Sequence, residues 1–235
     1  MNLFAKLSER EAASRPVRIG MIGAGKFGTM FLTQVRRTPG MHLAGLADLN
    51  VARARSQLAS AGWDAPQYAA SSPGEALKNR TTCVTDDAEA LIDCPDIDVI
   101  VEATGDPKTG IRFALAAIAH GKHIVMVNVE ADALAGPLLA RKAQSAGVIY
   151  SLAWGDQPAL ICEQVDWARA CGFRVISAGK GTRYHPTYHR SNPDTVWDIL
   201  DKYLRIDDRA SINPKMFNSF IDGTKSGIEM TAVCN

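Results

Sequence analysis

The chain has 235 residues, of which 46% are hydrophobic and 22% charged, a composition typical of a globular protein with one large domain or two small ones. Its 26 lysines and arginines nearly balance its 25 aspartates and glutamates, so no overall positive charge favours a nucleic acid, and we expect no such partner. The five cysteines are odd in number and form no Cys-x-x-Cys pair, so the sequence signals neither a disulfide framework nor a structural zinc site. A cytoplasmic location is the resulting expectation.

Residues 1–16 predict an amphipathic lead-in helix. Charged residues such as Lys6, Glu9 and Arg10 interrupt its apolar positions, which is not the pattern of a signal peptide. No later apolar stretch approaches the roughly 18 residues that a membrane-spanning helix needs. We therefore expect no membrane association.

Between Val17 and Tyr150, short β-branched runs alternate with longer helical patterns, which is typical of βαβ units that build a parallel sheet. This pattern predicts an α/β protein whose residues 17–152 form a doubly wound Rossmann domain that binds NAD(P). The strands are expected at 17–22, 42–47, 83–84, 99–103, 124–127 and 148–151, and the helices at 27–36, 51–61, 87–92, 110–120 and 131–145. The polar segment 66–79 is interpreted as a surface insertion.

After Ser151 the pattern changes, and residues 153–235 are predicted to form an α+β substrate and catalytic domain. A helix over 157–170 and an apolar strand over 173–178 are expected at its start. The chain stops at Asn235 inside an expected helix, so this domain is interpreted as the start of a longer one.

A glycine-rich loop follows the first expected strand and opens a helix, as the G-x-G-x-x-G mechanism requires. Gly23 permits the tight turn, Gly25 lets the backbone approach the pyrophosphate, and Gly28 allows close packing of helix against strand. The helix N-terminus offers free N–H donors to the phosphates. Lys26 and Phe27 lie within this loop and join the candidate cofactor residues.

Asp48 ends the second expected strand, twenty positions after Gly28, where an acidic residue usually binds the 2′-hydroxyl of the NAD ribose. Arg53 and Arg55 follow within two helical turns and would suit the 2′-phosphate of NADP instead. A solvent-exposed helix face explains both arginines equally well. NADP(H) and NAD(H) therefore both remain candidate cofactors.

Further cofactor contacts are expected at the carboxyl ends of the fourth and fifth strands, because ligands bind at that edge of open α/β sheets. Thr104 and Gly105 follow the fourth strand and are assigned to the ribose on the nicotinamide side. Asn128 follows the fifth strand and is placed at the same edge.

The stretch 179–190 is dense in basic and aromatic side chains and directly follows an expected strand. Lysine and arginine are suited to binding a phosphate or carboxylate, so the stretch predicts a small anionic substrate, with an exposed basic loop as the alternative. The candidate substrate-binding residues are Arg183, Tyr184, His185 and Arg190, together with Asn213 and Lys215 further along the chain.

Lys225 and Glu229 are four residues apart and share a face of the last expected helix, and Asp222 would join them if the helix began earlier. With Lys180 they are the candidate catalytic residues. Lys225 would polarise the substrate carbonyl or protonate the alkoxide, and the carboxylates would hold it in place. A divalent ion such as Mg²⁺ or Mn²⁺ held by Asp222 and Glu229 is conceivable, but the sequence does not identify a metal.

The loop at 23–28, the segment Val101-Glu102-Ala103-Thr104-Gly105 and the segment 121–125 resemble, in order and spacing, the cofactor domain of the homoserine dehydrogenase-like oxidoreductases. The resemblance covers residues 17–151 and implies a nicotinamide cofactor. Homoserine dehydrogenases usually have a lysine directly after the asparagine that ends the fifth strand, whereas Val129 follows Asn128 here. This difference argues against homoserine as the substrate.

The second half, from 154–158 through 179–190 to 222–225, is most similar to a divergent branch of that family, the 1-deoxy-D-xylulose 5-phosphate reductoisomerase-like enzymes of bacterial isoprenoid synthesis, whose relatives add an SAF-like module. This resemblance implies that NADPH reduces a rearranged sugar phosphate to 2-C-methyl-D-erythritol 4-phosphate. Homoserine dehydrogenase and a non-catalytic NAD(P)-sensing module are the alternatives. A homo-oligomer is expected from the general frequency of oligomers.

Overall fold

The computed structural model describes residues 2–182, 185–203, 209 and 212–235. The chain divides into two compact units, Met1–Ala153 (unit 1) and Trp154–Asn235 (unit 2). Among the described residues, no helix has the length and apolar character needed to span a membrane.

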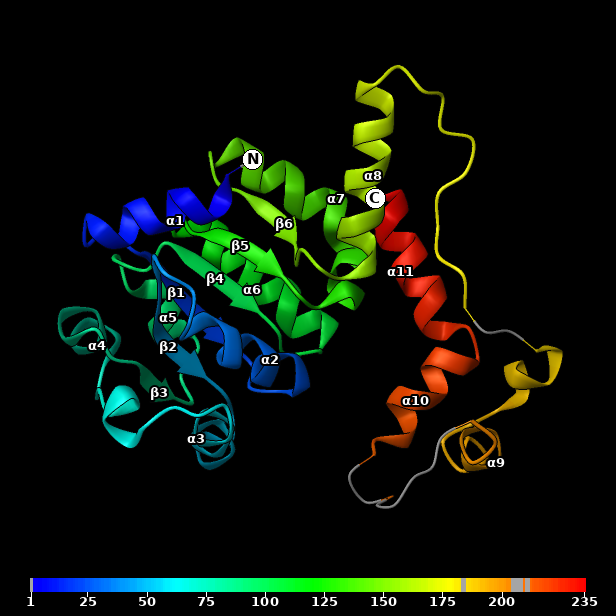
Figure 1. Cartoon of the computed structure of the whole chain (residues 1–235), viewed down its shortest axis with the longest axis horizontal. Helices are drawn as coiled ribbons and strands as arrows, with labels where there is room; N and C mark the ends of the chain where they lie inside the picture. Colours follow the sequence, from blue (N-terminus) through cyan, green and yellow to red (C-terminus); the bar gives the residue numbers. More distant parts are fainter. Residues whose placement is uncertain (1, 183–184, 204–208, 210–211) are drawn as a thin grey trace. The chain divides into compact units, whose positions relative to one another are not determined.

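Unit 1 is built on a six-stranded sheet in the order β3-β2-β1-β4-β5-β6, and every pairing is parallel (Figure 1). This is the strand order of the Rossmann fold, so the expected doubly wound parallel sheet is confirmed. The strands are β1 (Val17–Ile22), β2 (Met41–Ala47), β3 (Cys83–Thr85), β4 (Val99–Glu102), β5 (His123–Met126) and β6 (Tyr150–Leu152).

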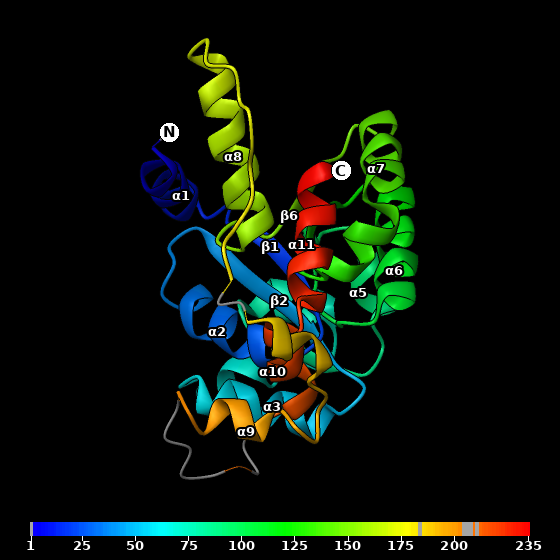
Figure 2. The same ribbon diagram turned by 90° about the vertical axis from the view of Figure 1, so that its right-hand side faces the viewer.

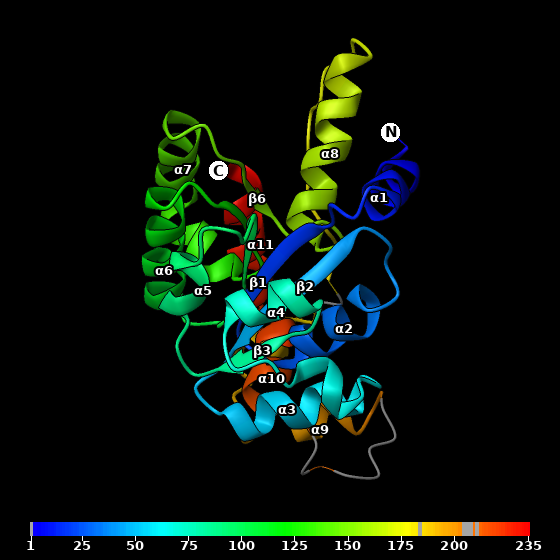
Figure 3. The ribbon, with the colours of Figure 1, turned by 90° about the vertical axis from the view of Figure 1, so that its left-hand side faces the viewer.

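Helices cover both faces of this sheet, with α2 and α3 on one side and α5, α6 and α7 on the other (Figures 2 and 3). Neighbouring residues of a strand point to opposite faces, so Ile100 joins the core beneath α6 and α7 while Val101 joins the core beneath α2 and α3. The helices of unit 1 are α1 (Leu3–Ala12), α2 (Lys26–Val35), α3 (Val51–Ser60), α4 (Pro73–Asn79), α5 (Glu89–Asp93), α6 (Pro107–Ala119) and α7 (Val129–Ser145).

The segment 66–79, interpreted above as a surface insertion, does lie between α3 and β3, but it carries regular structure. The 3-10 helix η1 (Ala65–Tyr68) is followed by α4, whose first turn contains Pro73 and is capped by the side chain of Ser72. Ala76 of α4 is fully buried. Local capping signals therefore outweigh the polar composition of the segment.

Unit 2 contains α8 (Gln157–Ala170), the 3-10 helix η2 (Pro186–Arg190), α9 (Trp197–Leu200), α10 (Pro214–Ile221) and α11 (Thr224–Cys234). The expected helix at 157–170 is confirmed. The expected strand at 173–178 is wrong, because these residues have no regular structure and none of the described strands pairs with them. Phe173 and Ile176 in this segment are 64% and 76% exposed.

Candidate functional site

A cavity of about 620 Å³ lies at the carboxyl ends of β1, β2 and β4, entirely within unit 1. This is the edge at which open α/β sheets bind their ligands. A hollow of equal volume between α6 and α7 is reached by neither the glycine-rich loop nor a strand end. Among the residues that line the first cavity are Gly23, Gly25, Asp48, Arg53, Thr104, Asp106, Thr109 and Arg112.

The glycine-rich loop forms one wall of this cavity. Gly23 has a φ of +101°, and a Cβ atom there would lie 2.5 Å from the carbonyl oxygen of Ala103. A Cβ at Gly28 would lie 3.1 Å from the carbonyl oxygen of Gly23, whereas the space around Gly25 is open. Gly25 is the N-cap of α2 and has no side chain that could accept a hydrogen bond from the first turn. The first turn of α2 therefore presents the type of N–H group that binds phosphates.

Asp48 directly follows β2, and both oxygens of its carboxylate accept hydrogen bonds. Its carboxylate accepts the backbone N–H groups of Ala24 and Asn50, both at 2.8 Å, and Arg53 donates to its two oxygens at 2.8 and 2.9 Å. Burial alone would raise the pKa of Asp48, but these hydrogen bonds and the arginine charge outweigh it and lower the pKa. Asp48 is therefore an anion whose acceptor positions are occupied, while the Arg53 side chain is 55% exposed.

Glu102 is a residue whose role the sequence analysis missed. It ends β4, is fully buried, and accepts hydrogen bonds through Oε1 from both the backbone N–H and the hydroxyl of Thr104. Burial raises its pKa, against the opposing effect of Thr104 and Asn128. In the sequence, this role is indicated by the position of Glu102, an acidic residue at the end of an otherwise apolar strand.

Asn128, Phe27 and Gly105 are not among the residues that line the cavity. Asn128 is 2% exposed, caps α7 by accepting from Ala131 N, and donates to the carbonyl oxygen of Asp106 at 2.9 Å. It therefore supports the first turn of α6 rather than lining the cavity. Phe27 packs on the core beneath α2 and α3, and Gly105 forms a turn at φ +75°. The side chain of Lys26 is outside the described part of the chain.

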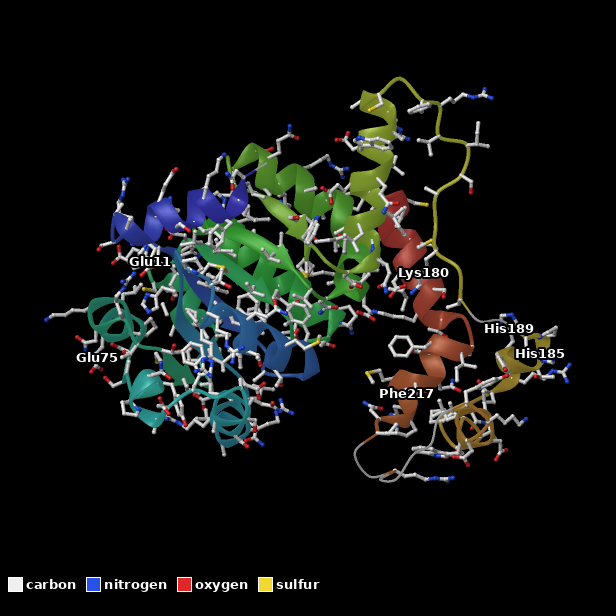
Figure 4. All side chains as sticks on the ribbon, in the orientation of Figure 1. Glu11, Glu75, Lys180, His185, His189 and Phe217 are labelled. Carbon is white, nitrogen blue, oxygen red and sulfur yellow. The ribbon has the colours of Figure 1, made fainter. Side chains whose placement is uncertain are left out.

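In unit 2, Lys180 and Glu229 form an ion pair between the segment after α8 and helix α11. The side chain of Glu229 is 2% exposed and that of Lys180 is 18% exposed. Beside them, the hydroxyls of Thr182 and Ser226 are hydrogen-bonded at 3.1 Å. Figure 4 labels Lys180, which lies next to α11. Two of the four candidate catalytic residues are thus brought together.

Lys225 and Glu229 both lie on α11, four residues apart as expected, but the helix does not begin early enough for Asp222 to join them. The chain turns at Gly223, with a φ of +91°, and α11 begins only at Thr224. The carboxylate of Asp222 accepts from Asn218 Nδ2 and from Thr224 N, both at 2.8 Å. It therefore joins α10 to α11.

The described substrate-binding candidates lie on two elements, His185 and Arg190 at η2 and Asn213 and Lys215 at the start of α10. Arg183 and Tyr184 lie outside the described residues. His185, Arg190 and Lys215 are exposed, and Asn213 caps α10 by accepting from Lys215 N at 3.1 Å. His185 and His189 are labelled in Figure 4.

A divalent ion finds no suitable set of ligands in the described part of the chain, where no three His, Cys, Asp or Glu side chains gather. Asp222 is bonded to Asn218 and Thr224, and Glu229 to Lys180. The residues proposed for a metal therefore do not fit one.

Two family models match the chain, one for each unit. The model described as the NAD-binding domain of homoserine dehydrogenase matches residues 23–152. The model described as the catalytic domain of oxidoreductase DRL matches residues 155–235. The first match confirms the expected resemblance of the cofactor domain.

Curated relatives include homoserine dehydrogenase of Pseudomonas aeruginosa, 29% identical over 137 residues, which are 58% of this chain and 29% of the relative. Homoserine dehydrogenase of Synechocystis sp. is 39% identical over 69 residues, 29% of this chain and 16% of that protein. The matches thus span less than a third of either relative.

Solved structures with similarity include a homoserine dehydrogenase from Thiobacillus denitrificans, 24% identical with a TM-score of 0.47, covering 61% of this chain and 30% of that one. An NAD-binding oxidoreductase from Klebsiella pneumoniae is 26% identical with a TM-score of 0.45, covering 66% and 39%.

Proposed function

Since the chain belongs to the family of the homoserine dehydrogenase NAD-binding domain, we propose that it transfers hydride between a nicotinamide dinucleotide and the carbonyl carbon of a small anionic substrate. Unit 1 would hold the cofactor and unit 2 would supply substrate-binding and proton-donating groups. The match of residues 155–235 to an oxidoreductase catalytic domain supports this division.

The observation that carries the proposal is the cavity at the strand ends. Gly23 and Gly25 line it beside the N-terminus of α2, and Asp48 and Arg53 line it at the end of β2. Phosphate-binding backbone and a charged group beside the ribose position, here the pair of Asp48 and Arg53, at the same edge are the two features that a dinucleotide needs.

We further propose that NADPH is preferred over NADH. Each oxygen of Asp48 already accepts one backbone N–H and one hydrogen bond from Arg53, which leaves little capacity for a ribose 2′-hydroxyl. Arg53 is more than half exposed and offers further donors to a 2′-phosphate. NADH binding would require Arg53 to leave the carboxylate. Arg53→Ala is therefore expected to weaken NADPH binding about tenfold or more and NADH binding much less.

For the substrate we propose a sugar phosphate of the 1-deoxy-D-xylulose 5-phosphate type. NADPH would deliver hydride to the aldehyde carbon of the rearranged sugar, and a protonated side chain would give the proton that completes 2-C-methyl-D-erythritol 4-phosphate. Lys180 is the proposed donor, because Glu229 fixes its ammonium group while part of the side chain reaches solvent. The exposed Arg190 would contribute positive charge for the phosphate.

Homoserine oxidation is the second candidate function. It is favoured by the sequence identity to the Pseudomonas aeruginosa enzyme over 137 residues. In that reaction the cofactor takes hydride from the alcohol carbon, and a deprotonated side chain accepts the hydroxyl proton.

The test begins with fluorescence titration of the protein with NADPH and NADH. NADPH oxidation is then followed at 340 nm with 1-deoxy-D-xylulose 5-phosphate, and NADP⁺ reduction with homoserine, each with and without Mg²⁺ or Mn²⁺. Lys180→Met should abolish turnover and leave cofactor affinity unchanged, whereas the matched Lys202→Met, at an exposed lysine of unit 2, should leave both unchanged. Cofactor binding without turnover on either substrate would refute both candidate reactions and leave the sensing module.

A further inference from the structure

Glu102 and Thr104 form a hydrogen-bonded pair at the end of β4, against the cofactor cavity. The carboxyl group is fully buried, while Thr104 is half-buried and lines the cavity. Both the backbone N–H, at 3.0 Å, and the hydroxyl of Thr104 donate to the same carboxyl oxygen, Oε1. This oxygen is therefore an acceptor whether the acid is ionised or neutral, since the proton of the neutral form would sit on Oε2.

This geometry fixes the direction of the Thr104 hydroxyl. A threonine hydroxyl has one hydrogen to donate and two lone pairs that accept. The hydrogen is committed to Glu102, so only lone pairs remain for a ligand in the cavity. A free hydroxyl would rotate and accept or donate equally, whereas Thr104 is restricted to accepting.

The surroundings keep Glu102 in place. A Cβ atom added at Gly110 of α6 would lie 2.9 Å from Glu102 Oε2 and 2.8 Å from Asn128 Nδ2. The first turn of α6 and the cap of α7 therefore close over the carboxyl group. Asn128 lies close enough to lower the pKa of the carboxyl group, but Oε2 accepts no hydrogen bond of normal geometry from the described residues. Its buried position is costly, which indicates a role other than stabilising the fold.

We propose that Glu102 is a positioning residue that turns Thr104 Oγ1 into an obligate acceptor for a donor group on the nicotinamide half of the cofactor. That half is expected beside β4, across the switch point of strand order from Asp48 on β2. It carries two kinds of donor, the ribose hydroxyls and the amide of the carboxamide. The inference rests on the proposed cofactor role of the cavity.

The test compares ligands that contain increasing parts of the cofactor: ADP, ADP-ribose and NADH, each titrated by calorimetry. Thr104→Val keeps the shape and removes the acceptor, and it should weaken NADH binding about three- to tenfold while ADP binding stays unchanged. An equal loss for ADP-ribose would assign the donor to the ribose, and no loss for ADP-ribose would assign it to the carboxamide. Thr104→Ser keeps the hydroxyl and should bind NADH like the wild type.

Glu102 variants separate positioning from a purely structural role. Glu102→Gln retains an acceptor oxygen for Thr104 and should keep NADH affinity within about twofold. Glu102→Leu releases the hydroxyl and should match the loss in Thr104→Val, and the double variant should be no weaker than either single variant.

The proposal is overturned if Thr104→Val binds NADH like the wild type, if the Glu102→Leu and Thr104→Val losses add, or if ADP affinity falls in parallel. A wild-type protein that binds neither NADH nor NADPH would instead refute the cofactor role of the cavity. Thermal melting of each variant confirms that folded protein is compared.

Discussion

The two units differ in what they bury. Unit 1 buries large apolar side chains on both faces of its sheet, and Met21, Ile100 and Ile124 are at most 1% exposed. In unit 2 the aromatic rings of Trp167 and Phe173 are 64% exposed, and the buried groups include the polar side chains Glu229 and Asn218. A parallel sheet needs continuous apolar strands, whereas the described part of unit 2 depends on caps, short helices and polar pairs.

The largest expected effect is on the free energy of unfolding, and it tests this contrast by replacing one isoleucine in each unit. Ile100→Ala removes a fully buried side chain from unit 1 and should lower the free energy of unfolding by about 2–5 kcal/mol. Ile176→Ala removes a side chain that is 76% exposed in unit 2 and should change it by less than about 0.5 kcal/mol. Urea unfolding followed by circular dichroism measures both. Similar losses in the two variants would mean that Ile176 is buried in solution.

The same contrast explains how much the sequence predicts. The apolar runs 17–22 and 42–47 match β1 and β2 within a residue, because strands buried on both faces have few alternatives. The run 173–178 has a similar composition but forms no strand, since strand formation requires a partner that local sequence does not specify. Strand propensity therefore predicts a strand correctly only where the tertiary structure supplies a strand to pair with.

The same dependence on tertiary structure decides which site residues the sequence predicts. The glycine-rich loop and Asp48 were predictable because spacing along a βαβ unit determines their positions. The pairing of Lys180 with Glu229 joins residues 49 positions apart, and the break at Gly223 moves Asp222 out of the predicted helix. Glu102 was overlooked because its function depends on what covers it, which periodicity does not reveal.

A second prediction separates folding from binding within the glycine-rich loop. Gly23→Ala forces a side chain into a left-handed conformation and against the Ala103 carbonyl, and should destabilise unit 1 by about 1–3 kcal/mol. Gly25→Ala meets no protein atom within 4 Å, so it should leave the melting temperature unchanged. It should still weaken cofactor binding, because the added Cβ would occupy space beside Gly25 that is proposed for the pyrophosphate. Calorimetric melting and NADPH titration check both. Unchanged affinity in Gly25→Ala would place the pyrophosphate elsewhere.

The third prediction concerns the polar core of unit 2. Glu229→Gln leaves the largely buried Lys180 ammonium without its counter-charge and should cost about 2 kcal/mol of unfolding free energy. Glu163→Gln is the matched control, because Glu163 is exposed and its carboxylate accepts a hydrogen bond from the indole N–H of Trp154. Lys180→Met combined with Glu229→Leu should recover much of the stability. If the double variant is as unstable as Glu229→Gln, the ion pair itself stabilises the unit.

The smallest effects concern two carboxyl groups of unit 1 whose pKa values shift in opposite directions. Burial would raise the pKa of Asp98, but the hydrogen bonds and charge of Arg18, at 2.6 and 3.0 Å, outweigh it and lower the pKa. The stability from this pair is present above the unfolded-state pKa of about 4 and is lost as pH falls through the lower folded-state value. Asp98→Asn should therefore cost about 1 kcal/mol or less at pH 7, since Arg18 is over a third exposed, and progressively less as pH falls below about 4.

The stability that Glu102 contributes changes with pH in the opposite direction, because burial raises the pKa of Glu102 and the folded state holds its proton more tightly. Its contribution is present below the unfolded-state pKa of about 4.3 and is lost as pH rises through the higher folded-state value. Glu102→Gln should therefore gain stability over the wild type as pH rises above about 4, whereas Asp98→Asn should lose stability relative to the wild type only as pH rises toward about 4 and stay level above it. Urea midpoints at several pH values compare the two variants. Parallel slopes would mean that Glu102 ionises in the folded protein as readily as in the unfolded chain, and that an unobserved partner satisfies its buried oxygen.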